Sequence, residues 1–207
     1  MSRSITRPTR LAALAAFALL SLALLFGFNA ATARADTLTL AGGWTTLTTD
    51  PGTTKALVAN KILPLPVYPS WVYPVFTPDG LALRYRFYIT GGQIDSTTLA
   101  GKIYHSGGLK FVNLRNGKSL KVTKFTIDTV NRQLTAYVPA LDVRVPILNL
   151  DLSRVQVKPG TPYTKVGPVG ARLTDTAAGA LNASLGTTIF KPGLKLGTAT
   201  VTARFAR

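Results

Sequence analysis

The stretch Leu81-Ala82-Leu83-Arg84-Tyr85-Arg86-Phe87-Tyr88-Ile89-Thr90 decides the fold class of this chain. Its odd-numbered positions are all apolar or aromatic, whereas two arginines and a threonine stand among the even-numbered ones. Successive side chains of a β-strand point to opposite faces. The pattern therefore predicts a half-buried strand whose other face carries basic side chains into solvent.

The same period of two recurs along most of the chain. Turn sequences such as Gly91-Gly92, Asn116-Gly117 and Pro159-Gly160 separate the alternating runs. Connections this short favour antiparallel neighbours. Further strands are predicted over residues 99–105, 109–114, 119–129, 133–138, 141–152, 154–158 and 195–205.

Two of these runs change phase along their length. In residues 119–129 the apolar positions change from even to odd, and in residues 141–152 they change from odd to even. A β-bulge, or a bend from one sheet to another, fits such a change. Pro146 lies inside the second run and indicates an edge or a bulge there.

Two short helices are predicted between the strands. Asp50-Pro51 offers an N-cap and a proline at the first helical position of a helix that ends near Asn60. Thr174 or Asp175 can cap a second helix, which Gly186 would end in a left-handed conformation. The predicted fold class is therefore mainly β: an antiparallel two-sheet sandwich with two short α-helices.

The N-terminus predicts export from the cytoplasm. Three arginines precede an apolar run from Leu11 to about Phe28, and small residues follow. This is the pattern of a secretory signal peptide, expected over residues 1–35, with a single mature domain over residues 36–207. Ala31-Thr32-Ala33 and Ala33-Arg34-Ala35 both match a cleavage site, and the second is preferred. If left uncleaved, the apolar run is long enough to anchor the chain in a membrane.

Composition excludes several kinds of chemistry. The 207 residues include no cysteine, no glutamate and one histidine, so thiolate metal sites, disulfides and cysteine nucleophiles are ruled out. Residues 1–35 contain four arginines and no acid, so +12 of the net charge of +16 remains after cleavage. This charge favours anionic partners such as envelope polyanions, although the basic residues are dispersed and also suit a solvated exterior. No recognition helix, zinc spacing or RNA-binding motif accompanies it, so nucleic acid is not predicted as a partner.

Residues 64–76 form a segment of unusual composition. They contain four prolines and four aromatic residues in thirteen positions, so they cannot form a central strand. Their rings either cap the end of the sandwich or offer an apolar surface to a ligand.

The segment Gly101-Lys102-Ile103-Tyr104-His105-Ser106-Gly107-Gly108-Leu109 carries a family resemblance. A glycine, a short strand ending in histidine, then glycines and a leucine opening the next strand resemble the middle of haem-transport-associated (HtaA-type) domains. Those are secreted or surface β-rich modules of actinobacteria. Looser agreement follows in the family's order at residues 134–138, 148–153, 173–174 and 190–193.

The resemblance implies haem as a cofactor. In the family, a tyrosine of the N-terminal helix, which follows a tryptophan, ligates the iron, and the histidine supports that tyrosine by a hydrogen bond. Trp44 is present, and only His105 carries over residue for residue, because the expected helix contains no tyrosine. A phenolate ligand would then have to come from another position, with Tyr68, Tyr73 and Tyr104 as the candidates.

Other roles for His105 remain open. By alternation its ring points inward with Ile103, where it either serves a ligand or satisfies local backbone groups at a hairpin end. A hydrolase would need it as a general base, but no serine of the chain lies in a nucleophile-elbow motif, so an enzyme is not predicted. The expected function is a secreted, non-enzymatic binding protein that captures haem or another hydrophobic anionic ligand. The alternative is a structural or adhesive module that binds envelope polyanions.

Overall fold

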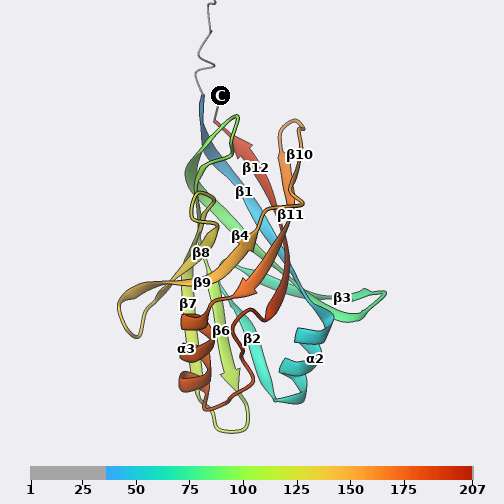
Figure 1. The fold of residues 1–207 in the computed structure, drawn as a ribbon, viewed down its shortest axis with the longest axis vertical. Coiled ribbons are helices and arrows are strands. Elements are labelled where there is room, and N and C mark those ends of the chain that lie inside the picture. Colours follow the sequence, from blue (N-terminus) through green and yellow to red (C-terminus); the bar gives the residue numbers. More distant parts are fainter. Residues whose placement is uncertain (1–35, 207) are drawn as a thin grey trace, which may run out of the picture. The chain divides into compact units, whose positions relative to one another are not determined.

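The computed structural model of the chain describes residues 36–206, so the signal peptide predicted over residues 1–35 lies outside it. The described chain forms twelve strands and two helices (Figure 1). The strands are β1 (Thr37–Thr49), β2 (Ile62–Val67), β3 (Trp71–Thr77), β4 (Gly80–Asp95), β5 (Gly101–His105), β6 (Gly108–Asn113), β7 (Ser119–Asp128), β8 (Gln133–Val138), β9 (Val143–Asp151), β10 (Gln156–Lys158), β11 (Thr164–Leu173) and β12 (Lys195–Phe205). The helices are α2 (Pro51–Ala59) and α3 (Asp175–Leu185).

Eight of the strands close into an antiparallel barrel, so the predicted two-sheet sandwich is wrong. Their order is β7-β5-β4-β1-β12-β11-β9-β8, and a further pairing of β7 with β8 joins the two ends. Alternation of apolar and polar residues is the same in a sandwich and in a barrel, because both bury one face of each strand. The pairing of β7 with β8 closes the sheet into a barrel. This pairing cannot be predicted from the alternation of apolar and polar residues.

The predicted phase changes are irregularities in the ladders of β8. The pairing of β7 with β8 shifts register between Thr123 and Thr126, and Lys124 between them has a positive φ of 50°. The pairing of β8 with β9 shifts between Leu134 and Thr135, opposite Pro146. Bulges bend and twist a strand. Here they lie in the wall of a barrel and do not carry a strand between two sheets.

Four strands extend the sheet beyond the barrel. β6 pairs with β7, and β2 pairs with β6, while β3 pairs with β4 and β10 with β11. The proline-rich segment supplies β2 and β3, which flank the barrel. Proline has no N–H to donate to a neighbouring strand. It is tolerated here because the side of the strand without the N–H faces away from the partner strand. The rings of Tyr68, Trp71 and Phe76 are exposed, so they do not cap an end of the barrel.

The two helices begin and end where the sequence predicts. Asp50 accepts a hydrogen bond from the backbone N–H of Gly52 at 3.0 Å, and Thr174 accepts one from Ala177 at 3.1 Å. Gly186 ends α3 with a φ of +62°. Figure 1 shows both helices toward the same end of the barrel, and α3 packs against β9, β7 and β6. Neither helix among residues 36–206 has the length and apolar character needed to cross a membrane.

Candidate ligand-binding site

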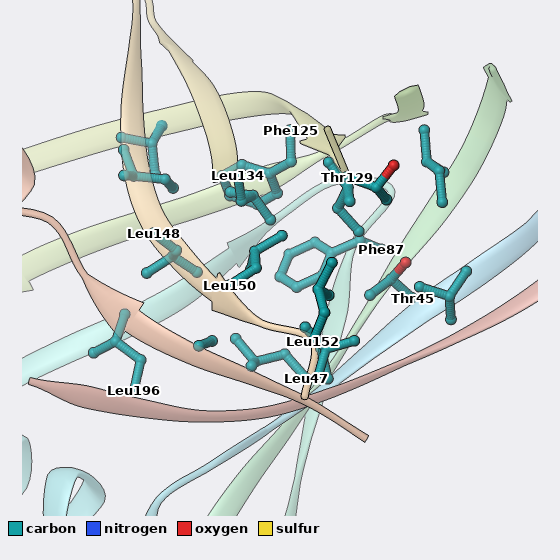
Figure 2. Close-up of a pocket in the computed structure, with 18 of the residues that line it drawn as sticks. Thr45, Leu47, Phe87, Phe125, Thr129, Leu134, Leu148, Leu150, Leu152 and Leu196 are labelled. Atoms are coloured by element: carbon teal, nitrogen blue, oxygen red, sulfur yellow. The ribbon is translucent and has the colours of Figure 1, made fainter. Parts of the chain in front are cut away.

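An apolar cavity of about 350 Å³ lies inside the barrel. Side chains from all eight barrel strands line it, together with residues of β6 and α3. In Figure 2, Leu134, Leu148, Leu150 and Phe87 surround the space. Its wall is apolar except for three threonines, and no charged side chain contributes to it. An eight-stranded barrel is just wide enough to be filled by side chains or to hold one small ligand, and this interior leaves room for a ligand.

His105 is buried beside this cavity, one side chain behind its wall. Its Nε2 lies 2.7 Å from the Thr45 hydroxyl, and its Nδ1 lies 3.3 Å from the carbonyl oxygen of Phe125. A carbonyl oxygen can only accept, so Nδ1 donates to it and Nε2 accepts the Thr45 proton. Burial lowers the pKa of His105 to about 4, so the ring is neutral at pH 7.

The inward orientation predicted for His105 is therefore confirmed. Thr45 contributes to the cavity wall and separates the imidazole from the cavity. The hydrogen bonds of both ring nitrogens go to Thr45 and to the backbone, and neither goes to a tyrosine. His105 thus positions the Thr45 hydroxyl at the wall.

The structure does not bring the three candidate tyrosines to His105. Tyr104 lies on the opposite, solvent-facing side of β5, and Tyr68 is 92% exposed after the end of β2. Tyr73 lies on β3, where its ring is tilted by 31° against that of Trp71, with 5.2 Å between centroids. The Arg84 guanidinium carbon lies 5.8 Å from the centre of the Tyr73 ring.

Tyr73 belongs to a cluster on the outer surface that the sequence analysis missed. The guanidinium of Arg86 lies between Trp44 and Trp71, at 4.7 Å and 4.8 Å from the two ring centres. We call Trp44, Trp71, Tyr73, Arg84 and Arg86 the outer cluster. Cations attract the faces of aromatic rings, so the stack holds β3, β4 and β1 together. The Arg86 Nε is buried without a hydrogen-bond partner among residues 36–206.

The spacing of the β3–β4 hairpin could have revealed the outer cluster. Trp71 pairs with Arg86 and Tyr73 with Arg84, at equal distances from the turn after Thr77. No strand was predicted in the proline-rich segment. Without a strand there was no register that would place these rings over the arginines.

The cavity does not fit haem. Haem iron takes an axial ligand such as histidine, tyrosine, methionine or cysteine, and none of these side chains lines the cavity. Its wall also lacks a lysine or arginine to meet the propionates. On the outer cluster, in contrast, a phenol lies beside a guanidinium. No group of three or more histidine and aspartate side chains among residues 36–206 could hold a metal ion.

Comparison with known proteins gives a likeness of fold. No family model matches the chain, and no curated protein matches it. The C-terminal domain of HtaA from Corynebacterium glutamicum superposes with a TM-score of 0.55 at 12% identity, over 82% of this chain and 99% of that one. The chain has an HtaA-type fold. The resemblance predicted from Gly101 to Leu109 is thus confirmed as a likeness of fold.

A second HtaA structure also matches. It is the domain-swapped dimer of a histidine-to-alanine variant of the same domain, at 13% identity and a TM-score of 0.46. It covers 100% of this chain and 98% of that chain.

Proposed function

We propose that this HtaA-type domain is a non-enzymatic binding protein that holds one small apolar ligand inside its barrel. The cavity carries the proposal: it has about 350 Å³ of space behind an almost wholly apolar wall. The signal peptide expected over residues 1–35 places this activity outside the cytoplasm, in solution or at the cell envelope.

The chemistry of the wall limits the ligand class. A charge moved into this cavity would lose its hydration and meet no opposite charge, so the buried part of the ligand is uncharged. Thr129 donates its hydroxyl proton to the Leu99 carbonyl oxygen, and Thr45 donates to His105. Few hydrogen-bonding groups therefore remain for the ligand, and its affinity comes from burial of apolar surface.

Filling the cavity tests this function. We expect the purified protein to bind the uncharged fluorophore N-phenyl-1-naphthylamine saturably, with one site per chain. Leu150→Trp puts a larger side chain into the cavity and should weaken binding at least tenfold, which corresponds to about 1.4 kcal/mol. Fluorescence titration measures the affinity.

Leu141→Trp is the matched control, because Leu141 is exposed on the loop between β8 and β9. It should leave binding unchanged. Ala171→Leu, at another lining position, provides a smaller filling change if the tryptophan variant does not fold. Equal affinity of wild type and both filling variants, or no saturable binding, would exclude the barrel as the site.

Haem is a second candidate ligand, supported by the HtaA-type fold and by the outer cluster. Tyr73 would supply a phenolate oxygen, and Arg84 and Arg86 would meet the carboxylates of the propionates. The buried Nε of Arg86, which has no hydrogen-bond partner among residues 36–206, supports an anionic group at this position.

Haemin titration separates the two ligands. We expect any Soret band of the bound pigment to be lost or shifted in Tyr73→Phe, which keeps the ring but removes the hydroxyl. Tyr104→Phe is the control, since Tyr104 lies on β5 away from the outer cluster. A band that weakens in His105→Ala and not in Tyr73→Phe would contradict the outer site and indicate haem beside the histidine.

A further inference from the structure

Two segments of the chain carry basic residues without any acidic ones. Residues 51–78 and 101–127 contain no aspartate, and the chain contains no glutamate. These two segments form α2, β2, β3, β5, β6 and most of β7. β2, β6 and β7 lie side by side, so Lys110 of β6 and Lys121 of β7 share one continuous surface.

The register of the three strands defines this surface. Leu65, Lys110 and Lys121 stand directly opposite one another across β2, β6 and β7, and Leu63 stands opposite Val112. The alternate residues, such as Ile62, Leu109 and Leu120, are buried on the other side of the sheet. We call Leu63, Leu65, Lys110, Val112 and Lys121 the basic-apolar face.

The basic-apolar face contains features that are unfavourable in water. Leu63 is 36% and Leu65 44% exposed, although both are aliphatic. Lys110 and Lys121 are opposed like charges, and such pairs destabilise a sheet. The two ion pairs among residues 36–206 use Lys102 and Lys195, so neither lysine of this face has an acidic partner there. An anionic partner with an apolar layer would relieve both costs.

The edge of the face disfavours a protein strand as that partner. β2 lies at the end of the strand order, but Pro64 and Pro66 remove two N–H donors from it. Strand addition depends on such main-chain hydrogen bonds. A partner that contacts side chains and not the strand edge fits better.

We propose that the basic-apolar face docks on a lipid bilayer that contains anionic phospholipids. Lys110 and Lys121 contact the phosphates, while Leu63 and Leu65 enter the boundary between headgroups and acyl chains. This inference does not depend on a ligand in the barrel.

Vesicle binding tests the proposal. We expect the protein to co-sediment with vesicles of phosphatidylcholine and phosphatidylglycerol, and much less with phosphatidylcholine alone. Each lysine near an anionic surface is worth about fivefold in affinity, so Lys110→Gln/Lys121→Gln should weaken binding at least tenfold. Leu63→Ser/Leu65→Ser should also weaken it, and both residues are exposed enough for the fold to tolerate the change.

The chain offers a closely matched control. Lys158 and Lys165 also stand directly opposite each other, on β10 and β11, and both are exposed. Lys158→Gln/Lys165→Gln removes the same charge from a pair of the same geometry and should leave most of the binding. Equal losses in the two lysine variants would mean that net charge alone attracts the protein, and would overturn the proposal.

Binding to a soluble polyanion is the second test, which distinguishes a lipid bilayer from negative charge alone. Polyphosphate has the charge of a headgroup array but no apolar layer. If Leu63→Ser/Leu65→Ser binds the vesicles as well as wild type does, the partner is a polyanion and not a bilayer, and the proposal fails. Stronger binding to vesicles than to polyphosphate, lost in the leucine variant, is the supporting result.

Discussion

Replacement of Tyr85 by alanine is expected to lower the free energy of unfolding by about 3 to 5 kcal/mol, the usual cost of removing a large buried aromatic side chain. Tyr85 is 1% exposed, and its ring stacks with Phe87 at 6.2 Å. Its hydroxyl donates a 2.6 Å hydrogen bond to the carbonyl oxygen of Pro64. The side chain thus fills the core and also ties β2 to the barrel strand β4. Urea denaturation followed by circular dichroism measures the loss.

Two further tyrosine variants separate the contribution of the buried ring from that of the hydrogen bond. Tyr85→Phe keeps the ring and removes only the hydrogen bond, so it should cost about 1 kcal/mol. Tyr68→Ala removes a side chain that is almost fully in solvent and should change stability by less than about 0.5 kcal/mol. If Tyr85→Ala were as mild as Tyr68→Ala, the ring of Tyr85 would not be part of the core.

The second large effect is a loss of stability in weak acid that depends on His105. Above pH 6.5 the imidazole is neutral in both the folded and the unfolded chain. Between pH 6.5 and about 4 the unfolded chain takes up a proton that the buried ring does not, because burial holds the folded pKa near 4. Stability therefore falls as the pH falls through this range, by on the order of 3 kcal/mol, and His105 adds nothing further below pH 4.

His105→Gln tests the assignment. Glutamine can hydrogen-bond as the imidazole does but does not titrate, so the variant should be nearly as stable at pH 5 as at pH 7. Urea midpoints at a series of pH values measure the difference. Four aspartates have pKa values below the ordinary value of 3.8: Asp50, Asp95, Asp128 and Asp151. The stability that they give the protein is lost as the pH falls from about 3.8 downward, which is below the range of His105. The same decline between pH 6.5 and 4 in wild type and variant would show that another group causes it.

Strands with strong local signals were predicted closely. The bounds of β8 (Gln133–Val138) and β12 (Lys195–Phe205) agree with the sequence analysis, as do the caps of both helices. β1 (Thr37–Thr49) and β11 (Thr164–Leu173) were missed. Both contain glycines at positive φ, such as Gly43 and Gly167, which interrupt the pattern typical of strands. Without these two strands, closure of the sheet could not be inferred.

The candidate site was predicted less well than the individual strands and helix caps. The inward position of His105 followed from alternation along β5, because a strand side chain shares its face with the residue two positions away. Its hydrogen-bond partner could not be predicted in this way, because Thr45 is 60 residues distant in the sequence. The two residues come together only because β4 pairs with both β1 and β5. The arginine between Trp44 and Trp71 was also not predicted, because no strand was expected in the proline-rich segment that carries Trp71.

The amino-acid sequence alone determined the features that depend on a few neighbouring residues: the mainly β class, the helix caps, the inward face of each alternating strand, and a likeness to HtaA-type domains. Only the tertiary structure shows that the sheet closes on itself through the pairing of β7 with β8 and leaves an apolar cavity inside. Closure depends on pairing between strands whose local patterns would equally suit a sandwich. The volume left inside then depends on how side chains from eight strands pack together.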